Sequence, residues 1–275
     1  MKRLLAILTL VIFYYNIYSQ SNKLSDSCFI AISINDCDPD VGVSDSIVYI
    51  FQNFTSIDKF ISTHNLIHFY NIPNDTFSLL VNNLNQTSYI RWENIHNNKL
   101  PNELFGIENL KRLHIHNTNI ENVPEEIGNL SELEELVIRN TKIQSLPISI
   151  GQLVNLKYLY LNNNKLTNLA CGIKSLHNLT LIDVSHNEFD LFPCELCSNY
   201  YLKEIYFNFN YLKSIPDCIY NLNNLVILEF NNNVIHDIPD NLEQIPNLWK
   251  VSWKSNPLNE SDIELCKRLI KRKLK

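Results

Sequence analysis

Glycine is scarce in this sequence, with five residues among 275. The five are too scattered to form the glycine-rich loop with which many enzymes hold phosphate groups. The chain also lacks a nucleophile elbow and a pair of carboxylates at catalytic spacing. These absences argue against an enzyme, and we expect a non-enzymatic protein that needs no cofactor.

The chain also has fewer basic than acidic residues. The chain has 23 Lys and Arg residues against 29 Asp and Glu, a formal net charge of −6, which argues against nucleic acid as a partner. The last ten residues are the exception, with basic side chains at Lys267, Arg268, Lys271, Arg272, Lys273 and Lys275. We interpret residues 259–275 as a C-terminal cap helix that starts with a capping box of Ser261 and Glu264. The alternative is a contact with an anionic surface, such as lipid or acidic polysaccharide.

The longest apolar run at the N-terminus is too short to cross a membrane. Lys2 and Arg3 precede the run Leu4–Tyr15, which falls well below the roughly 20 residues of a membrane-spanning helix. This layout is typical of a secretory signal peptide, and we assign residues 1–19 to it. We therefore expect a secreted, periplasmic or cell-surface protein. An uncleaved segment, giving a membrane-anchored repeat scaffold, is the alternative.

A unit of 23 residues repeats through most of the chain. LKRLHIHNTNIENV begins at Leu110, LEELVIRNTKIQSL at Leu133 and LKYLYLNNNKLTNL at Leu156. Each unit has two apolar residues spaced two apart: Ile67/Phe69, Ile90/Trp92, Leu113/Ile115, Leu136/Ile138, Leu159/Leu161, Ile182/Val184, Ile205/Phe207, Leu228/Phe230 and Val251/Trp253. A spacing of two is typical of a short strand with one buried face, so each unit predicts one strand.

The rest of each unit must return the chain to the start of the next strand. Most units continue with an apolar residue and a proline, as in Val123-Pro124, and proline ends strand pairing. The return has apolar residues three apart, such as Ile127 and Leu130, which predicts a short helical turn and a parallel crossover. We therefore predict an α/β repeat solenoid with a parallel sheet on its inner side.

The units match the pattern LxxLxLxxNxLxxLPxxIxxLxNL. The chain therefore resembles the leucine-rich repeat proteins, in particular the 23-residue form of Shoc-2-like and many bacterial proteins. The resemblance assigns residues 110–258 to leucine-rich repeats and residues 64–109 to degenerate ones. It implies a horseshoe with a parallel sheet on the concave face, short helical or irregular convex segments, and caps at both ends. Residues 20–63 would form the N-terminal cap region.

The ninth position of five units is asparagine: Asn164, Asn187, Asn210, Asn233 and Asn256. In the family this residue bridges the backbones of adjacent units, because its amide has two donors and one acceptor oxygen. Thr118 and Thr141 replace it in two units, which should be less stable. Asn162 and Asn163 should face solvent or a ligand.

Seven cysteines in a chain expected to be exported favour disulfides. Cys28 and Cys37 could close a short loop in the N-terminal cap region. Four others should cluster on the outer side and form one or two bridges between units, leaving Cys266 unpaired: Cys171, Cys194, Cys197 and Cys218. A redox pair of Cys194 and Cys197, or a zinc site, is the less favoured alternative.

Metal binding is not expected elsewhere either. His114 and His116, with His68 and Arg91, have the residue types of a metal or anion site, but we find no carboxylate placed to complete a ligand set. The acidic segment at Asp36 resembles a calcium loop, yet Ile47 stands where a bidentate glutamate is needed.

The strand residues beside each buried pair should face the concave side. They fall into a cationic zone, an aromatic and aliphatic centre, and acidic residues that complete the face. The predicted site residues are Arg112, His114, His116 and Arg139; Tyr158, Tyr160, Leu181, Tyr206, Phe209 and Ile227; and Asp183, Glu204 and Glu229. Grouped aromatics on a rigid face favour a binding site, although tyrosine is also a good strand former.

We therefore expect a protein partner on the concave face. The alternative is a carbohydrate, with tyrosines stacking on sugar rings and asparagine side chains bonding to hydroxyl groups.

Overall fold

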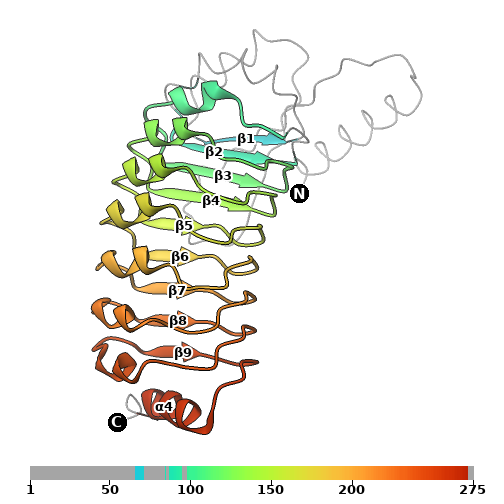
Figure 1. Ribbon diagram of the computed structural model, residues 1–275. Coiled ribbons are helices and arrows are strands. Elements are labelled where there is room, and N and C mark those ends of the chain that lie inside the picture. Colours follow the sequence, from blue (N-terminus) through green and yellow to red (C-terminus); the bar gives the residue numbers. More distant parts are fainter. Residues whose placement is uncertain (1–65, 71–83, 85–86, 95–97, 272–275) are drawn as a thin grey trace, which may run out of the picture.

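The computed structural model describes residues 66–70, 84, 87–94 and 98–271 (Figure 1). The predicted signal peptide 1–19, the cap region 20–63 and the cysteines Cys28 and Cys37 lie outside the described residues.

One parallel sheet runs through the described part of the chain, with nine strands in sequence order. The strands are β1 (Leu66–Tyr70), β2 (Tyr89–Glu93), β3 (Arg112–His116), β4 (Glu135–Arg139), β5 (Tyr158–Tyr160), β6 (Leu181–Asp183), β7 (Glu204–Tyr206), β8 (Ile227–Glu229) and β9 (Lys250–Ser252). Residues 23 apart are partners at every step, for example His114 with Val137. The strands stack one above another in an open sheet (Figure 1). The predicted repeat solenoid is confirmed.

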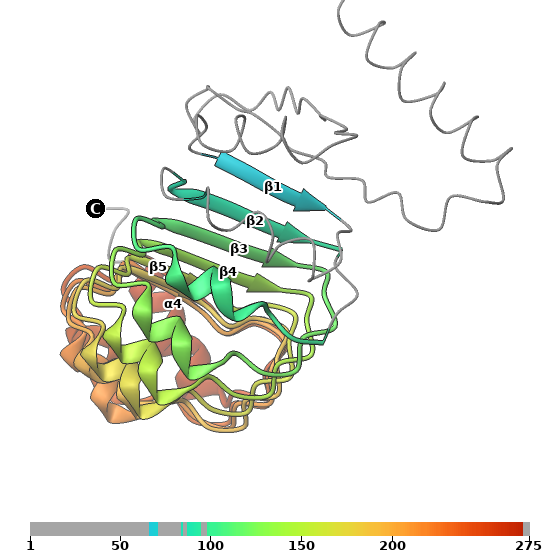
Figure 2. The same ribbon diagram turned by 90° about the horizontal axis from the view of Figure 1, so that it is seen from above.

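The return segments are short 3-10 helices on the far side of the core from the sheet (Figure 2). They are η2 (Asn102–Gly106), η3 (Glu125–Asn129), η4 (Ile148–Gln152), η5 (Cys171–Ser175), η6 (Cys194–Ser198), η7 (Asp217–Asn221) and η8 (Asp240–Gln244). Proline precedes all of these except η5, which follows Ala170. The carbonyl of Pro124 accepts from the N–H of Ile127, and Ile127 in turn accepts from Leu130. The two apolar residues predicted for each return are therefore fixed by one turn of helix.

The core lies between the sheet and the 3-10 helices. Apolar residues of both layers are buried, as Ile115 and Ile127 show, and both have no exposed surface. Phenyl rings fill the C-terminal half, where Phe207 packs against Phe189 and Phe192 with ring centroids 5.4 and 5.1 Å apart. Every repeat thus buries its apolar residues against its neighbours.

A ladder of asparagines connects the repeats at the ninth position. The amide nitrogen of Asn187 donates to the carbonyls of Leu161 in the preceding repeat and Val184 in its own, at 2.9 and 3.0 Å. Its amide oxygen accepts from the N–H of Leu166 at 2.9 Å. The same three kinds of contact recur at Asn210, Asn233 and Asn256. Each asparagine therefore satisfies backbone groups of two repeats where the chain leaves the strand.

The two threonine repeats differ from this pattern. Asn164 donates to Ile138 and Leu161, but its oxygen accepts from the N–H and hydroxyl of Thr141. The buried hydroxyl of Thr118 has no hydrogen-bond partner among the described residues. Thr118 thus leaves the ladder incomplete at its own repeat, whereas the hydroxyl of Thr141 donates to Asn164 and accepts from the N–H of Ile143.

The residue just before the ladder position has a left-handed backbone. Eight such residues occur among the described ones, 23 apart and with φ between 53 and 59°: Asn94, Asn117, Asn140, Asn163, His186, Phe209, Asn232 and Ser255. Asparagine tolerates this conformation better than other residues with a side chain. The chain therefore makes this sharp bend without glycine.

The C-terminal helix α4 (Glu260–Lys271) follows the last strand (Figure 1). The predicted capping box of Ser261 and Glu264 is wrong, because the side-chain oxygen of Asn259 accepts from the N–H of Asp262 at 2.9 Å. Leu265 and Cys266 of this helix are buried. Arg268 forms an ion pair with Glu243 of η8 at 2.8 Å, so part of the basic cluster holds the helix against the last repeat.

The cysteines of the repeats form one disulfide within the described chain, between Cys197 of η6 and Cys218 of η7. Cys171 and Cys194 are exposed free thiols, and Cys266 is a buried one. Burial raises the pKa of the Cys266 thiol to about 12. The pairing of Cys197 with Cys218 leaves no Cys194–Cys197 redox pair.

Candidate functional site

The strand residues that point away from the core form a surface that we call the open sheet face. It corresponds to the predicted concave face. The strand register brings one row of side chains together across it: Arg91, His114, Val137, Tyr160, Asp183, Tyr206, Glu229 and Ser252. A parallel row contains Arg112, Glu135, Tyr158, Leu181, Glu204, Ile227 and Lys250.

At β2 to β4 this face carries a hydrogen-bonded chain. The Nε2 atom of His114 lies 2.9 Å from Glu135 Oε1, and its Nδ1 atom lies 2.7 Å from the hydroxyl of Tyr89. Because a carboxylate can only accept, Nε2 donates to Glu135, and the tyrosine hydroxyl bonds to the other ring nitrogen. The hydrogen bond from His114 lowers the pKa of Glu135.

The predicted cationic zone is therefore balanced by carboxylates that sequence reasoning missed. Arg112 lies 3.7 Å from Glu135, and Arg91 lies 2.8 Å from Glu93. Glu93 stands two residues from Arg91 along the same strand, and Glu135 stands one repeat from Arg112. These two spacings could have predicted the ion pairs from the sequence, because the 23-residue register places the paired residues side by side.

The centre of the face holds the aromatic and aliphatic residues. Tyr158 is 41% exposed, and Tyr160, Leu181, Tyr206 and Ile227 are each partly exposed. We call these five residues the tyrosine cluster. Each of them keeps part of its side chain open to solvent.

Polar neighbours hold some of these rings in place. The hydroxyl of Tyr206 donates to Glu204 at 2.6 Å, and burial together with this bond raises the pKa of Tyr206. The guanidinium carbon of Arg139 lies 4.6 Å from the ring centroid of Tyr160. On the C-terminal side, Glu229 accepts from Asn208 at 3.1 Å and pairs with Lys250. The cluster is thus a group of aromatic and aliphatic side chains with Asp183 and Glu204 standing among them.

Phe209 does not belong to this cluster, contrary to the prediction. It has the left-handed backbone described above, is 48% exposed, and stacks on His186 with centroids 4.1 Å apart. The reason is its place at the eighth position, where the chain has already bent away from the strand.

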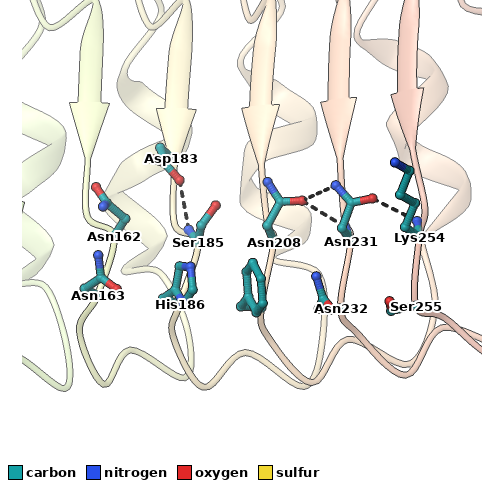
Figure 3. Close-up of a pocket in the computed structure, with 11 residues that line it drawn as sticks. Asn162, Asn163, Asp183, Ser185, His186, Asn208, Asn231, Asn232, Lys254 and Ser255 are labelled. Atoms are coloured by element: carbon teal, nitrogen blue, oxygen red, sulfur yellow. Dashed lines mark hydrogen bonds between the residues drawn. The ribbon is translucent and has the colours of Figure 1, made fainter.

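Phe209 and His186 line a pocket at the C-terminal ends of strands β5 to β9, which we call the loop-edge pocket. The pocket has a volume of about 550 Å³. Figure 3 shows two rows of polar side chains along it, Asn162, Ser185, Asn208, Asn231 and Lys254 in one and Asn163, His186, Asn232 and Ser255 in the other. Asp183 turns toward this pocket and accepts from the N–H of Ser185 at 2.9 Å.

The described residues hold no group of three or more His, Cys, Asp or Glu side chains placed to bind a metal ion. No helix within them has the length and apolar character needed to cross a membrane.

Residues 79–210 match the family model described as a leucine-rich repeat region. Together with the 23-residue register of the sheet, this match identifies the chain as a leucine-rich repeat protein. No curated protein matches the chain.

Solved structures share the fold at low identity. An internalin, InlF, from Listeria monocytogenes has a TM-score of 0.58 and 17% identity, over 66% of this chain and 52% of that one. Internalin C2 of the same bacterium has a TM-score of 0.60 and 18% identity, over 78% and 87%. The leucine-rich repeat ectodomain of the receptor kinase GASSHO1/SCHENGEN3 from Arabidopsis thaliana, solved with Casparian strip integrity factor 2, has a TM-score of 0.57 and 23% identity. That match covers 69% of this chain and 23% of the ectodomain.

Proposed function

We propose that this chain is an exported, non-enzymatic leucine-rich repeat protein that binds a protein partner through the open sheet face. The observation that carries the proposal is the tyrosine cluster, a group of exposed and partly exposed aromatic and aliphatic side chains at the centre of the open sheet face. Tyrosine buries a large area at a low cost in side-chain entropy and is common at the energetic centre of interfaces. The ectodomain complex named above provides one example of this fold with a bound factor.

The size of the face supports a protein partner. Strands in a sheet are spaced by about 4.8 Å, so the nine described strands give a surface on the order of 40 Å long. A standard interface buries about 800 Å² on each partner, which such a surface can supply. The ion pairs at the two ends of the face, Arg112 with Glu135 and Lys250 with Glu229, match the polar edges that interfaces usually have.

Export is supported by two independent features. The N-terminal sequence has the basic start and short apolar run of a signal peptide. The disulfide between Cys197 and Cys218 is typical of proteins in oxidising compartments.

The test is an affinity measurement with face-specific variants. A partner is first captured from the surface and extracellular fractions of the source, and its affinity is then measured for the wild type and for Tyr160→Ala/Tyr206→Ala. We expect the affinity to fall at least about tenfold. The matched control is Tyr200→Ala/Tyr220→Ala, which removes two exposed tyrosines outside the sheet. Equal affinity of both double variants would exclude the tyrosine cluster as the site.

A carbohydrate ligand is the second candidate function, and the loop-edge pocket favours it. Its rows of amides donate and accept hydrogen bonds, as sugar hydroxyls require, and the exposed Phe209–His186 stack supplies an apolar surface. A glycan array separates the two candidates. Saturable binding to an isolated glycan that is lost in Phe209→Asn would support carbohydrate, and a blank array would oppose it.

A further inference from the structure

A pocket opens on the open sheet face over Val137 of β4. Val137 has a smaller side chain than its row neighbours His114 and Tyr160, lies between them, and is 3% exposed. Its larger neighbours leave a hollow of about 450 Å³, which we call the Val137 pocket. Its lining is otherwise polar or aromatic: Tyr89, Arg91, His114, His116, Glu135, Arg139 and Tyr160.

Arg139 differs from the other cations of the sheet strands. Arg91, Arg112 and Lys250 each form an ion pair with a carboxylate. Arg139 has no ion-pair partner among the described residues, and its buried Nε atom has no hydrogen-bond partner there either. A guanidinium keeps its charge at any ordinary pH, and leaving a buried donor without a hydrogen-bond partner is unfavourable. Arg139 can therefore donate hydrogen bonds to an oxygen atom of a bound ligand.

His116 stands beside Arg139 with a second unused nitrogen. The two residues are direct partners in the register of β3 and β4. The Nε2 atom of His116 is buried and likewise has no hydrogen-bond partner in the described chain. Two unsatisfied nitrogens thus lie at one edge of the same pocket.

The charge around the pocket also favours an anion. Three guanidinium groups (Arg91, Arg112, Arg139) stand against two carboxylates (Glu93, Glu135), which gives 3 − 2 = +1 with both histidines neutral. Both carboxylates are already engaged, Glu93 by Arg91 and Glu135 by His114 and Arg112. The positive charge left over is that of Arg139.

We propose that the Val137 pocket receives the carboxylate of an aspartate or glutamate side chain of the protein partner. This inference rests on the proposed function and specifies the chemistry of the partner. The Nε of Arg139 and one of its terminal nitrogens form the fork that a carboxylate fits, while the Tyr160 ring supports the guanidinium plane. The Nε2 of His116 supplies a third donor when it carries a proton.

The pocket makes this binding dependent on pH. Burial, with Arg91 and His114 nearby, lowers the pKa of His116 to about 4, so its ring is neutral at pH 7 in the free protein. A bound carboxylate favours the protonated ring and raises its pKa, so binding takes up protons and affinity increases as the pH falls from 7 toward 5. The charged groups that act on this ring from the neighbouring strands are Arg91, Glu93 and Arg139, and Glu135 lines the same pocket. The lowered pKa of Glu135 keeps that carboxylate ionised through the same range.

The experiment is an NMR titration of the histidine ring signals of the full chain with N-acetylglutamate amide, which carries one side-chain carboxylate. N-acetylglutamine amide is the neutral isostere, and inorganic phosphate tests for a general oxyanion site. We expect saturable shifts of His116 with the carboxylate probe alone. We also expect binding to be roughly threefold or more tighter at pH 5.5 than at pH 7.5.

Arg139→Gln should weaken probe binding at least about tenfold, and Arg139→Lys should lie between it and the wild type, because lysine keeps the charge but not the fork. Lys250→Gln is the matched control, since it also replaces a cation of the open sheet face with glutamine but lies outside the pocket and pairs with Glu229, and it should bind as the wild type does. Equal binding of the glutamine isostere, tighter binding of phosphate, or unchanged binding by Arg139→Gln would each overturn the proposal.

The two proposals fail in different ways. If Tyr160→Ala/Tyr206→Ala loses the partner while Arg139→Gln keeps full affinity for it, the carboxylate inference is wrong and the binding face stands. If the probe binds through Arg139 but the tyrosine variant keeps its partner, the proposed function is wrong and the pocket stands.

Discussion

Three consecutive asparagines, Asn162, Asn163 and Asn164, have three different roles in one repeat. Asn162 lines the loop-edge pocket, and its buried amide oxygen has no partner among the described residues. Asn163 adopts the left-handed backbone with φ of 59°. Asn164 is buried and bonds to the carbonyls of Ile138 and Leu161. A single residue type thus serves a surface, a bend and the core.

The left-handed position can be tested at Asn163, whose exposed side chain has no part in the asparagine ladder. Asn163 is exposed, so Asn163→Gly should leave stability nearly unchanged, whereas Asn163→Val should lower the free energy of unfolding by about 1–2 kcal/mol. Urea unfolding measures both. Lys165→Val is the control, an exposed nearby position with an ordinary backbone. If valine costs the same at both positions, the backbone conformation is not what selects asparagine.

The incomplete ladder at Thr118 predicts a stabilising substitution. An asparagine there would reach the carbonyls that its counterparts reach in the later repeats and would replace an unpartnered hydroxyl. Thr118→Asn should therefore raise the free energy of unfolding by about 1 kcal/mol. The reverse change, Asn210→Thr, should lower it. A loss of stability in Thr118→Asn would show that the N-terminal repeats are spaced differently from the later ones.

At the scale of elements, the 3-10 helices set how closely the repeats approach on the outer side. A Cβ atom added to Gly172 of η5 would lie 2.2 Å from the carbonyl oxygen of Ile148 in η4. A Cβ on Gly151 would meet the backbone of Gly172 at 2.5 Å. Gly151 and Gly172 thus mark a backbone contact between two 3-10 helices, and neither lies at a left-handed bend.

Gly172→Ala should therefore force η4 and η5 apart. We expect the free energy of unfolding to fall by about 1–3 kcal/mol, as for other overpacked sites. Gly106→Ala in η2 is the control, because nothing lies within 4 Å of its added Cβ, and it should be neutral or slightly stabilising. Thermal unfolding of the two variants gives the comparison, and equal midpoints would contradict the close approach.

The disulfide connects η6 to η7 and closes a loop between residues 21 apart in sequence. Constraining a loop of that length in the unfolded chain is worth about 3 kcal/mol. Reduction should therefore lower the free energy of unfolding by about 3 kcal/mol, which urea unfolding measures. Cys171→Ser/Cys194→Ser removes only free thiols and should leave the free energy of unfolding unchanged. An intact mass that shows both Cys197 and Cys218 open to alkylation without reductant would contradict the bridge.

At the scale of the whole molecule, the period of 23 residues was sufficient to predict the fold. The apolar positions that each repeat must bury against its neighbours predict the number of strands and their parallel register. They also predict the return segments on the outer side of the core. Chemistry on the open sheet face was harder to predict. The pairing of Arg112 with Glu135 depends on residues 23 apart, and the departure of Phe209 from the tyrosine cluster depends on one left-handed residue. Periodicity predicts which face a side chain is on, whereas its partners depend on the register and the local bend.

The most direct test of the central claim is oxidative footprinting of tyrosine side chains in the free chain and in its complex with the captured partner. The proposal predicts that the partner lowers the oxidation of Tyr158, Tyr160 and Tyr206 on the open sheet face. The exposed tyrosines outside the sheet, Tyr200, Tyr201 and Tyr220, should react as before. Protection of the outer tyrosines with unchanged oxidation of the tyrosine cluster would contradict binding through the open sheet face.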